Sequence, residues 1–211
     1  MEAYGTEAVE LMPEVRQRFH EELRALEGDV QRTGAQAHLL LEMALQALAR
    51  GDLGSCEEVV RGDDEVDKLY LDVERRILHL FALQTPVASD LRLLTALLHI
   101  NLHLERVGDQ AVNLAKITRL ADGLPQNPKV LQDLEEMGAV ALRMVAAAMQ
   151  ALARRDVELA RKLPEMDDPI DELNAACCRT FLRYRTTSAC SSGGSGCMSC
   201  RARSSGSATT R

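Results

Sequence analysis

The stretch QALARGDLGSCEEVVRGDDEVDKL (residues 46–69) recurs 104 positions later as QALARRDVELARKLPEMDDPIDEL (residues 150–173). The alignment needs no gap, and ten of its 24 positions are identical, among them Asp63 with Asp167 and Asp67 with Asp171. Self-similarity at a fixed spacing is typical of a chain built from copies of one structural unit. We therefore expect two copies of a single helical unit.

Each copy begins with a long amphipathic helix pattern. In the first copy, apolar side chains recur every three or four residues from Leu23 to Leu48, which predicts a helix over about residues 13–50. The second copy predicts a corresponding helix over about residues 130–155. Asp52 and Asp156 follow these helices and are placed to cap the short helical segment after each.

Two further helices complete the first copy. An apolar stripe from Val66 to Leu80 predicts a second long helix over about residues 63–84, which Thr85-Pro86 ends. A third helix then runs to about residue 121, and Gly123-Leu-Pro125 closes the unit. Long helices joined by short turns predict an antiparallel three-helix bundle. The fold class is thus expected to be all-α, with two tandem three-helix bundles of the up-down, spectrin-like kind.

The second copy departs from this plan at its end. Residues 186–211 are rich in Ser, Gly, Thr and Cys and have no helical period, where a third helix is expected. The expected domains are therefore a first bundle at 13–122, a second bundle of two helices at 127–185, and a tail at 186–211. Without a third helix, the second bundle would have an apolar groove between its two helices. The groove would be bordered by Met137, Ala141, Met144, Ala148 and Leu152 on one helix and by Leu173 and Phe181 on the other.

The codons of the tail suggest where the missing helix went. If the third base of each codon is joined to the first two bases of the next, residues 186–192 permit Asp-Val-Arg-Leu-Leu-Leu. That sequence matches Asp90-Leu-Arg-Leu-Leu of the first copy. Residues 203–211 likewise permit Leu-Glu-Arg-Val-Gly-Asp-His-Ala, which matches residues 104–111. We expect the tail to be a frameshift product of a third helix, and the coding DNA around codon 186 tests this.

Composition and charge exclude several classes of function. The 211-residue chain has no Trp and a net charge of −7, and the six arginines after residue 172 leave −13 on the first 172 residues. Such a surface repels nucleic acid, and the arginine-bearing tail lacks the lysines and stacking aromatics that nucleic-acid binding needs. No secretion signal and no apolar run of about 20 residues is evident, so we expect a cytoplasmic protein without membrane insertion. Cys197-Met-Ser-Cys200 has the spacing of half a zinc site, but no second half follows.

Paired carboxylates four residues apart are the candidate site. Glu105 and Asp109 share one helix face, and counting back by sevens from Glu105 reaches Leu98 and Leu91, which places Glu105 on a line expected to face the core. A carboxylate on such a line needs a counterion or a metal. Gly108, beside the pair, is expected to allow a helix or an ion to approach closely. The alternative is a solvated acidic face with Arg106 as counterion.

Two more pairs occupy equivalent places in the two copies. Asp63 and Asp67 form one, and Asp167 and Asp171 form the other. Facing pairs from two helices would make an all-oxygen site for a hard cation. Near a helix start, however, acidic side chains also suit the helix dipole, so the alternative of a solvated face is favoured for Asp63 and Asp67 taken alone.

No arrangement of residues indicates an enzyme. The chain contains no nucleophile elbow, no phosphate-binding Gly-rich loop and no His-Glu-x-x-His motif. His99 and His103 precede the acidic pair, but the Glu-x-x-His pattern of di-iron bundles is absent. We therefore expect a binding protein with no catalytic and no organic cofactor-binding residues.

Jointly, three segments resemble the PhoU family of phosphate-signalling regulators. They are the repeated Asp-Asp-x-Val/Ile-Asp, Gln84-Thr-Pro-Val-Ala-Ser-Asp-Leu-Arg92, and Leu104-Glu-Arg-Val-Gly-Asp109. The resemblance covers residues 19–185. It implies two tandem three-helix bundles in a cytoplasmic negative regulator of the phosphate-starvation response. Such a protein couples the ATPase subunit of a phosphate ABC transporter to a sensor histidine kinase, often as a homodimer.

The resemblance also implies metal binding. Several PhoU proteins bind multinuclear clusters through an acidic Glu/Asp-x-x-x-Asp motif, with Fe, Mg, Mn or Zn as candidate ions. That motif corresponds here to Asp63, Asp67, Glu105, Asp109, Asp167 and Asp171. Two other interpretations stay open. The chain could be a helical metal-storage protein, or a truncated product without function, because the second Glu-Arg-Val-Gly-Asp is missing.

Overall fold

The computed structural model describes residues 4–84 and 86–175, and all regular structure within them is helical. The all-α fold class is therefore confirmed. In chain order the elements are α1 (Tyr4–Arg50), α2 (Leu53–Gln84), α3 (Ala88–Leu120), α4 (Pro128–Arg154), α5 (Val157–Lys162) and the 3-10 helix η1 (Pro164–Met166). Helical structure resumes at Asp168 and continues to Ala175, where the described residues end.

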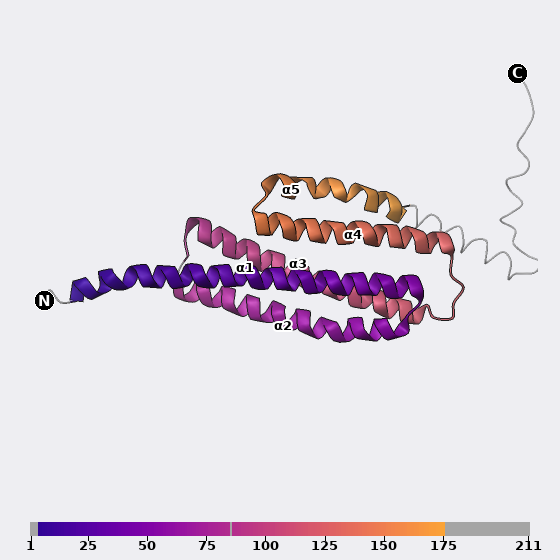
Figure 1. Cartoon of the computed structure of the whole chain (residues 1–211), viewed down its shortest axis with the longest axis horizontal. Helices are drawn as coiled ribbons and strands as arrows, with labels where there is room; N and C mark the ends of the chain where they lie inside the picture. The colour runs from indigo at the N-terminus through magenta and orange to yellow at the C-terminus, as the bar shows by residue number, and fades with distance from the viewer. Residues whose placement is uncertain (1–3, 85, 176–211) are drawn as a thin grey trace, which may run out of the picture.

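The first three helices form a bundle in which α1 packs against both α2 and α3 (Figure 1). Its core is made mostly of Leu, Val and Ala, as the shortage of aromatic residues requires. One buried cluster comprises Phe19, Leu23, Leu26, Val30, Val73, Ile77, Leu80, Leu94, Leu97 and Leu104. The other comprises Leu40, Ala44, Ala47, Cys56, Val59, Val66, Ala111, Val112 and Ala115.

Helices α4 and α5 lie on one side of this bundle (Figure 1). Helix α4 packs along α1 at two glycines. A Cβ added at Gly138 would clash with Cδ2 of Leu45, and one added at Gly34 would lie 2.6 Å from Cε of Met149. The two contacts run in opposite directions along the chain, so α1 and α4 are antiparallel. Small residues at these points let the helix backbones come close.

The repeat is visible in the local geometry of the two copies. The carboxylate of Asp52 accepts hydrogen bonds from the backbone amides of Gly54 and Ser55, and that of Asp156 accepts one from the amide of Leu159 at 2.9 Å. Capping at both positions was predicted. The preceding residues, Gly51 and Arg155, are both left-handed, with φ of 65° and 53°. Only Gly adopts this conformation without strain, so the second copy keeps the turn at an energetic cost.

Two predicted helix starts are wrong. Helix α1 begins at Tyr4 rather than near residue 13, and α2 runs unbroken from Leu53, so that no separate helix starts near residue 63. In the second copy the same region is interrupted between α5 and η1. Pro164 stands where the first copy has Val60. A proline inside a helix removes one backbone hydrogen bond and clashes with the preceding turn, which explains the difference.

Helix α4 corrects another expectation. An 18-residue window of α4 reaches a mean hydropathy of 1.2, so that by length and composition alone this helix could cross a membrane, although no run of that kind was expected. Only 17% of the window is buried. Both values are explained if α4 is a bundle helix with two apolar faces. One face packs against α1, and the other is not covered by any of the described residues.

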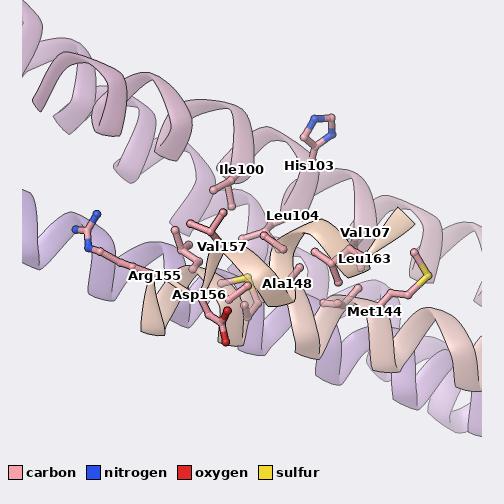
Figure 2. Close-up of a pocket in the computed structure, with 15 residues that line it drawn as sticks. Ile100, His103, Leu104, Val107, Met144, Ala148, Arg155, Asp156, Val157 and Leu163 are labelled. Carbon is pink, nitrogen blue, oxygen red and sulfur yellow. The ribbon is translucent and has the colours of Figure 1, made fainter. Parts of the chain in front are cut away.

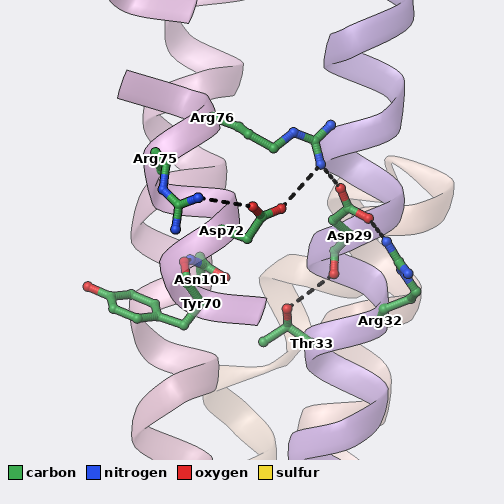
Figure 3. A network of polar contacts seen from close by, with 8 residues as sticks. All are labelled: Asp29, Arg32, Thr33, Tyr70, Asp72, Arg75, Arg76 and Asn101. Carbon is green, nitrogen blue, oxygen red and sulfur yellow. Dashed lines mark hydrogen bonds and ion pairs between the residues drawn. The ribbon is translucent and has the colours of Figure 1, made fainter. Parts of the chain in front are cut away.

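A polar network ties α1 to α2 near the middle of the bundle (Figure 3). Asp29 is only 6% exposed, and its carboxylate pairs with the guanidinium groups of Arg32 and Arg76. Arg76 also lies 3.7 Å from the carboxylate of Asp72. Thr33 donates a hydrogen bond from its hydroxyl to the backbone carbonyl of Asp29 at 3.1 Å. A buried acid with two cationic partners is a strong constraint on how α1 and α2 align.

Candidate functional site

Two contacts fix how α2 and α3 face each other. The side-chain amide of Asn101 donates a hydrogen bond to the backbone carbonyl of Tyr70 at 2.9 Å. Two turns further along α3, Gly108 lies against Asp63. The order of these contacts shows that the helices are antiparallel, which places the Asp63–Asp67 pair of α2 opposite the Glu105–Asp109 pair of α3.

Gly108 is the point of closest approach between these pairs. A Cβ added there would lie 2.7 Å from Oδ1 of Asp63 and 3.3 Å from Cγ1 of Val66. Any larger residue would push the carboxylate and the valine away. The close approach expected at Gly108 is therefore present, and what approaches is the carboxylate of the facing helix.

The charges of Asp67 and Asp109 act on both Asp63 and Glu105. Burial, followed by the charges of Asp67, Asp109 and Glu105, raises the pKa of Asp63 to about 6. Burial, followed by the charges of Asp109 and Asp67, also raises the pKa of Glu105, while Arg106 opposes this. We call these four residues (Asp63, Asp67, Glu105, Asp109) the acidic seam. At neutral pH the acidic seam is a concentration of negative charge, and the charge of Arg106 opposes it at Glu105.

Glu105 is less buried than the sequence suggested. Along the line counted by sevens, Leu91 is 43% exposed, Leu98 and Glu105 are half-buried, and Val112 is only 7% exposed. A straight helix drifts by about 20° per seven residues relative to such a line, so the line winds from solvent into the core. Glu105 lies where it crosses the edge of the core, and its carboxylate is within reach of water.

The pair of the second copy stays apart from the seam. Asp167 and Asp171 are both exposed, and neither contributes to the raised pKa values of Asp63 and Glu105. The backbone amide of Asp171 donates to the carbonyl of Asp167 at 3.2 Å, as in the first turn of a helix. The position 104 residues after Glu105 is 209, outside the described residues, as are Phe181 and the Cys197–Cys200 pair.

The seam has the donor chemistry of a hard-cation site without a closed coordination shell. All four side chains offer only oxygen, which suits Mg, Mn, Ca or iron. Within residues 4–84 and 86–175, however, no three His, Cys, Asp or Glu side chains converge closely enough to hold a metal ion. The carboxylates thus match a cation in chemistry and charge, but the described residues do not by themselves form a metal cluster.

Sequence reasoning missed two residues that border the seam. Tyr70 donates a hydrogen bond to Glu74 at 3.3 Å, and burial, Glu74 and Glu105 raise its pKa. Asn101 is fully buried, and its Oδ1 has no hydrogen-bond partner among the described residues. An asparagine in the apolar line from Leu94 to Leu104 was the available signal, because a buried amide normally needs partners for all its polar atoms.

The raised pKa of Asp63 predicts how stability depends on pH. Because the folded-state pKa lies above the unfolded value of 3.8, ionised Asp63 opposes folding above about pH 6, and this cost disappears toward pH 4. A pKa difference of this size corresponds to about 3 kcal/mol, which solvent around the half-buried side chain reduces to about 1 kcal/mol. The free energy of unfolding of Asp63→Asn should therefore be about 1 kcal/mol higher than that of the parent at pH 7.5.

Urea unfolding at pH 7.5, 6.0 and 4.5 checks this prediction. The advantage of Asp63→Asn should shrink steadily as the pH falls. Glu65→Gln is the matched control, because Glu65 is exposed two residues away and is not among the groups that raise the Asp63 pKa. An equal gain in Glu65→Gln, or a gain that does not depend on pH, would contradict the explanation.

In a comparison with known proteins, both copies of the repeat match the same family model. A family model described as the PhoU domain matches residues 30–118 and again residues 134–193. These two blocks cover most of the chain and correspond to the two repeats. The chain belongs to the PhoU family. The resemblance inferred from the three sequence segments is thereby confirmed.

Individual PhoU proteins agree with this assignment. The chain is 35% identical over 145 residues to the "Phosphate-specific transport system accessory protein PhoU homolog" of Aquifex aeolicus, a match that spans 68% of this chain and 65% of that protein. It is 32% identical over 157 residues to PhoU homolog 1 of Mycobacterium tuberculosis, spanning 74% of this chain and 71% of the relative.

Solved PhoU structures share the fold. The crystal structure of PhoU from Pseudomonas aeruginosa superposes with a TM-score of 0.77 at 25% identity, covering 80% of this chain and 81% of that one. The phosphate transport system regulatory protein PhoU from Streptococcus pneumoniae gives a TM-score of 0.72 at 26% identity, covering 78% and 77%. The tandem helical bundles expected from the repeat are thus the architecture of PhoU proteins.

Proposed function

We propose that this chain is a regulatory accessory protein of phosphate-specific transport that acts in the cytoplasm and catalyses no reaction. In this proposal it keeps phosphate-starvation genes silent while phosphate is plentiful. It does so as a homodimer that contacts the ATPase subunit of a phosphate ABC transporter and a phosphate sensor histidine kinase. Membership of the PhoU family carries the proposal, because the relatives are named as accessory proteins of that transport system.

The surface supports a role in protein contacts. Three long helices present continuous faces more than 30 residues in length, and the first 172 residues carry all 32 acidic side chains. Regulators that work through protein contacts need extended, charged surfaces of this kind, whereas an enzyme needs convergent catalytic groups in a pocket.

Deletion of the gene in its own organism tests the proposal. Starvation genes should then be expressed at high phosphate, and the intact chain supplied from a plasmid should silence them again. Gly28→Leu, which places a side chain in open space, should restore silencing as well. Unchanged expression of the starvation genes at high phosphate after deletion would overturn the regulatory role. Binding to the transporter ATPase or the kinase of the same genome would then have no regulatory consequence.

A second candidate function is cation binding at the acidic seam. Burial, followed by the charges of the neighbouring carboxylates, raises the pKa of Asp63 to about 6, and a bound cation would relieve the repulsion among these carboxylates. Asp63, Asp67, Glu105 and Asp109 would be the ligands from the described residues. Such an ion would supply positive charge between α2 and α3 and would hold the two helices together.

Calorimetric titration with Mn²⁺ at pH 7.5 tests this second candidate. The parent chain should bind saturably, Asp63→Asn should bind at least tenfold more weakly, and Glu65→Gln should match the parent. Equal heats for all three chains would remove the cation site. Metal analysis of the purified protein adds a separate result, because the absence of bound metal would exclude a storage role and leave the regulatory proposal intact.

A further inference from the structure

An open apolar groove of about 660 Å³ lies between α3, α4 and α5 (Figure 2). Leu104 and Val107 of α3 form one wall, and Met144 and Ala148 of α4 form the opposite wall, with Leu163 closing the side next to α5. Polar groups are confined to the rim. Among them, Arg155 is engaged with Glu27 of α1 by an ion pair. Such a surface favours binding of an apolar ligand over a polar one.

The repeat identifies what this groove corresponds to. Five residues of the groove stand 104 positions after five core residues of the first bundle: Met144, Ala148, Ala151, Ala160 and Leu163 correspond to Leu40, Ala44, Ala47, Cys56 and Val59. In the first bundle all five are at most 4% exposed and share a core cluster with Ala111, Val112 and Ala115 of α3. The groove is therefore the second-copy counterpart of the surface that α3 covers.

The exposure of the groove shows that this cover is missing from the described part of the chain. Cys56 is fully buried, whereas its counterpart Ala160 is exposed. Leu40 is 4% exposed, whereas Met144 is only half-buried. The chain's own tail is a poor candidate for the cover, because residues 186–211 contain no Leu, Ile or Val.

We propose that the groove binds, in trans, an amphipathic α-helix with the small-residue face of α3. That face reads Gly-x-x-Ala-Val-x-x-Ala over residues 108–115. It is about two turns long, which matches the roughly 12 Å that residues 144–152 of α4 span at 1.5 Å per residue. The partner is thus a protein or peptide that supplies one helix of this pattern and completes a three-helix bundle around α4.

The small residues that α4 and α5 contribute to the groove favour a helix over other occupants. Alanines at 148, 151 and 160 allow a helix backbone to come close, and a helix brings its own backbone hydrogen bonds already satisfied. A second copy of the chain fits less well, because its α4 would bring large residues such as Met144, Met149 and Leu152 to a surface whose first-bundle counterpart meets the small-residue face of α3. A free lipid chain would leave the two-turn match with α3 unexplained.

A peptide of residues 100–120 is the direct probe, because it carries the α3 pattern that covers the equivalent surface. Labelled peptide titrated with the full chain should bind saturably with one peptide per chain, and the complex should melt at a higher temperature than the chain alone. Ala148→Trp fills the groove and should weaken binding at least tenfold. Ala146→Trp adds the same side chain at an exposed position of α4 and should change binding by less than twofold.

Changes in the peptide give the reciprocal test. Ala111→Arg in the peptide should abolish binding, whereas Asn113→Arg, at a position exposed in α3, should retain it. Ala160→Arg is a second groove variant if circular dichroism shows that Ala148→Trp has not folded. Equal binding by the parent and the folded groove variants would overturn the proposal. So would sedimentation showing that the groove variants break a dimer of the parent chain, because a second copy would then be the occupant of the groove.

Discussion

Gly108→Leu should destabilise the first bundle by about 3 kcal/mol, because its side chain has no room between α2 and α3. Even a Cβ at this position would lie 2.7 Å from Oδ1 of Asp63 and 3.3 Å from Cγ1 of Val66, and the leucine adds three further carbons. The helices must then separate, which opens the core at Val66 and disperses the acidic seam. Urea unfolding followed by circular dichroism measures the loss.

Gly28→Leu is the matched control for this change. Gly28 also lies within a long helix, but nothing is within 4 Å of a Cβ placed there. Because leucine favours helix by nearly 1 kcal/mol over glycine, Gly28→Leu should be neutral or slightly stabilising. Equal losses in both variants would show that helix α3 does not approach α2 closely at Gly108. The same two variants can be compared in the strain that lacks the gene, where Gly108→Leu should fail to silence the starvation genes.

Asp29→Ala should cost about 2 kcal/mol. The carboxylate is nearly buried, so its removal deletes two charge-assisted contacts at once and leaves the guanidinium of Arg76 beside a vacated site (Figure 3). Arg76 keeps a contact with Asp72, and its side chain is 36% exposed, so solvent limits the loss. The free energy of unfolding in urea at pH 7 measures the effect.

Asp72→Ala serves as the comparison within the same network. Its side chain is 51% exposed, and its contacts with Arg75 and Arg76 are longer, at 3.8 and 3.7 Å. Exposed ion pairs of this kind contribute about 0.5 kcal/mol. A loss in Asp72→Ala as large as that in Asp29→Ala would mean that burial is not what makes the α1–α2 tie strong.

Periodicity and repetition were enough to predict the architecture. The ends of α1 at Arg50, α2 at Gln84 and α3 at Leu120 follow from Gly51, the Thr85-Pro86 pair and the Gly123–Pro125 turn. Both aspartate caps follow from the repeat as well. These features are local: a capping side chain or a proline acts on the residues next to it, so the sequence around it contains the whole cause.

Features that depend on packing between helices were harder to predict. The continuity of α2 through Asp63 depends on the absence of a proline, and only the comparison with Pro164 makes that absence informative. The role of Asp29 could not be predicted, because its ion pair with Arg76 joins residues that are 47 positions apart in the sequence. A linear pattern shows that two positions lie on helices, but it does not give the alignment that brings them together.

In the candidate site, too, the local features were predictable from the sequence and the features that depend on helix packing were not. Spacing alone placed Asp63 with Asp67 and Glu105 with Asp109, and Gly108 indicated a close approach. That the two pairs face each other follows from the antiparallel alignment of α2 and α3, which the sequence does not specify residue by residue. The pair formed by Asp167 and Asp171 stays a prediction, because its expected counterpart lies outside the described residues.

The central claim is that α2 and α3 hold four carboxylates in one electrostatic field around Asp63. Titration of the Asp63 carboxyl carbon by ¹³C NMR, from pH 3 to pH 8 in metal-free buffer, tests it most directly. Burial of Asp63 together with the charges of the seam predicts a midpoint of about 6, which should fall when Asp67 and Asp109 are both replaced by Asn. A midpoint near the ordinary value of 3.8 in the parent chain would contradict the claim.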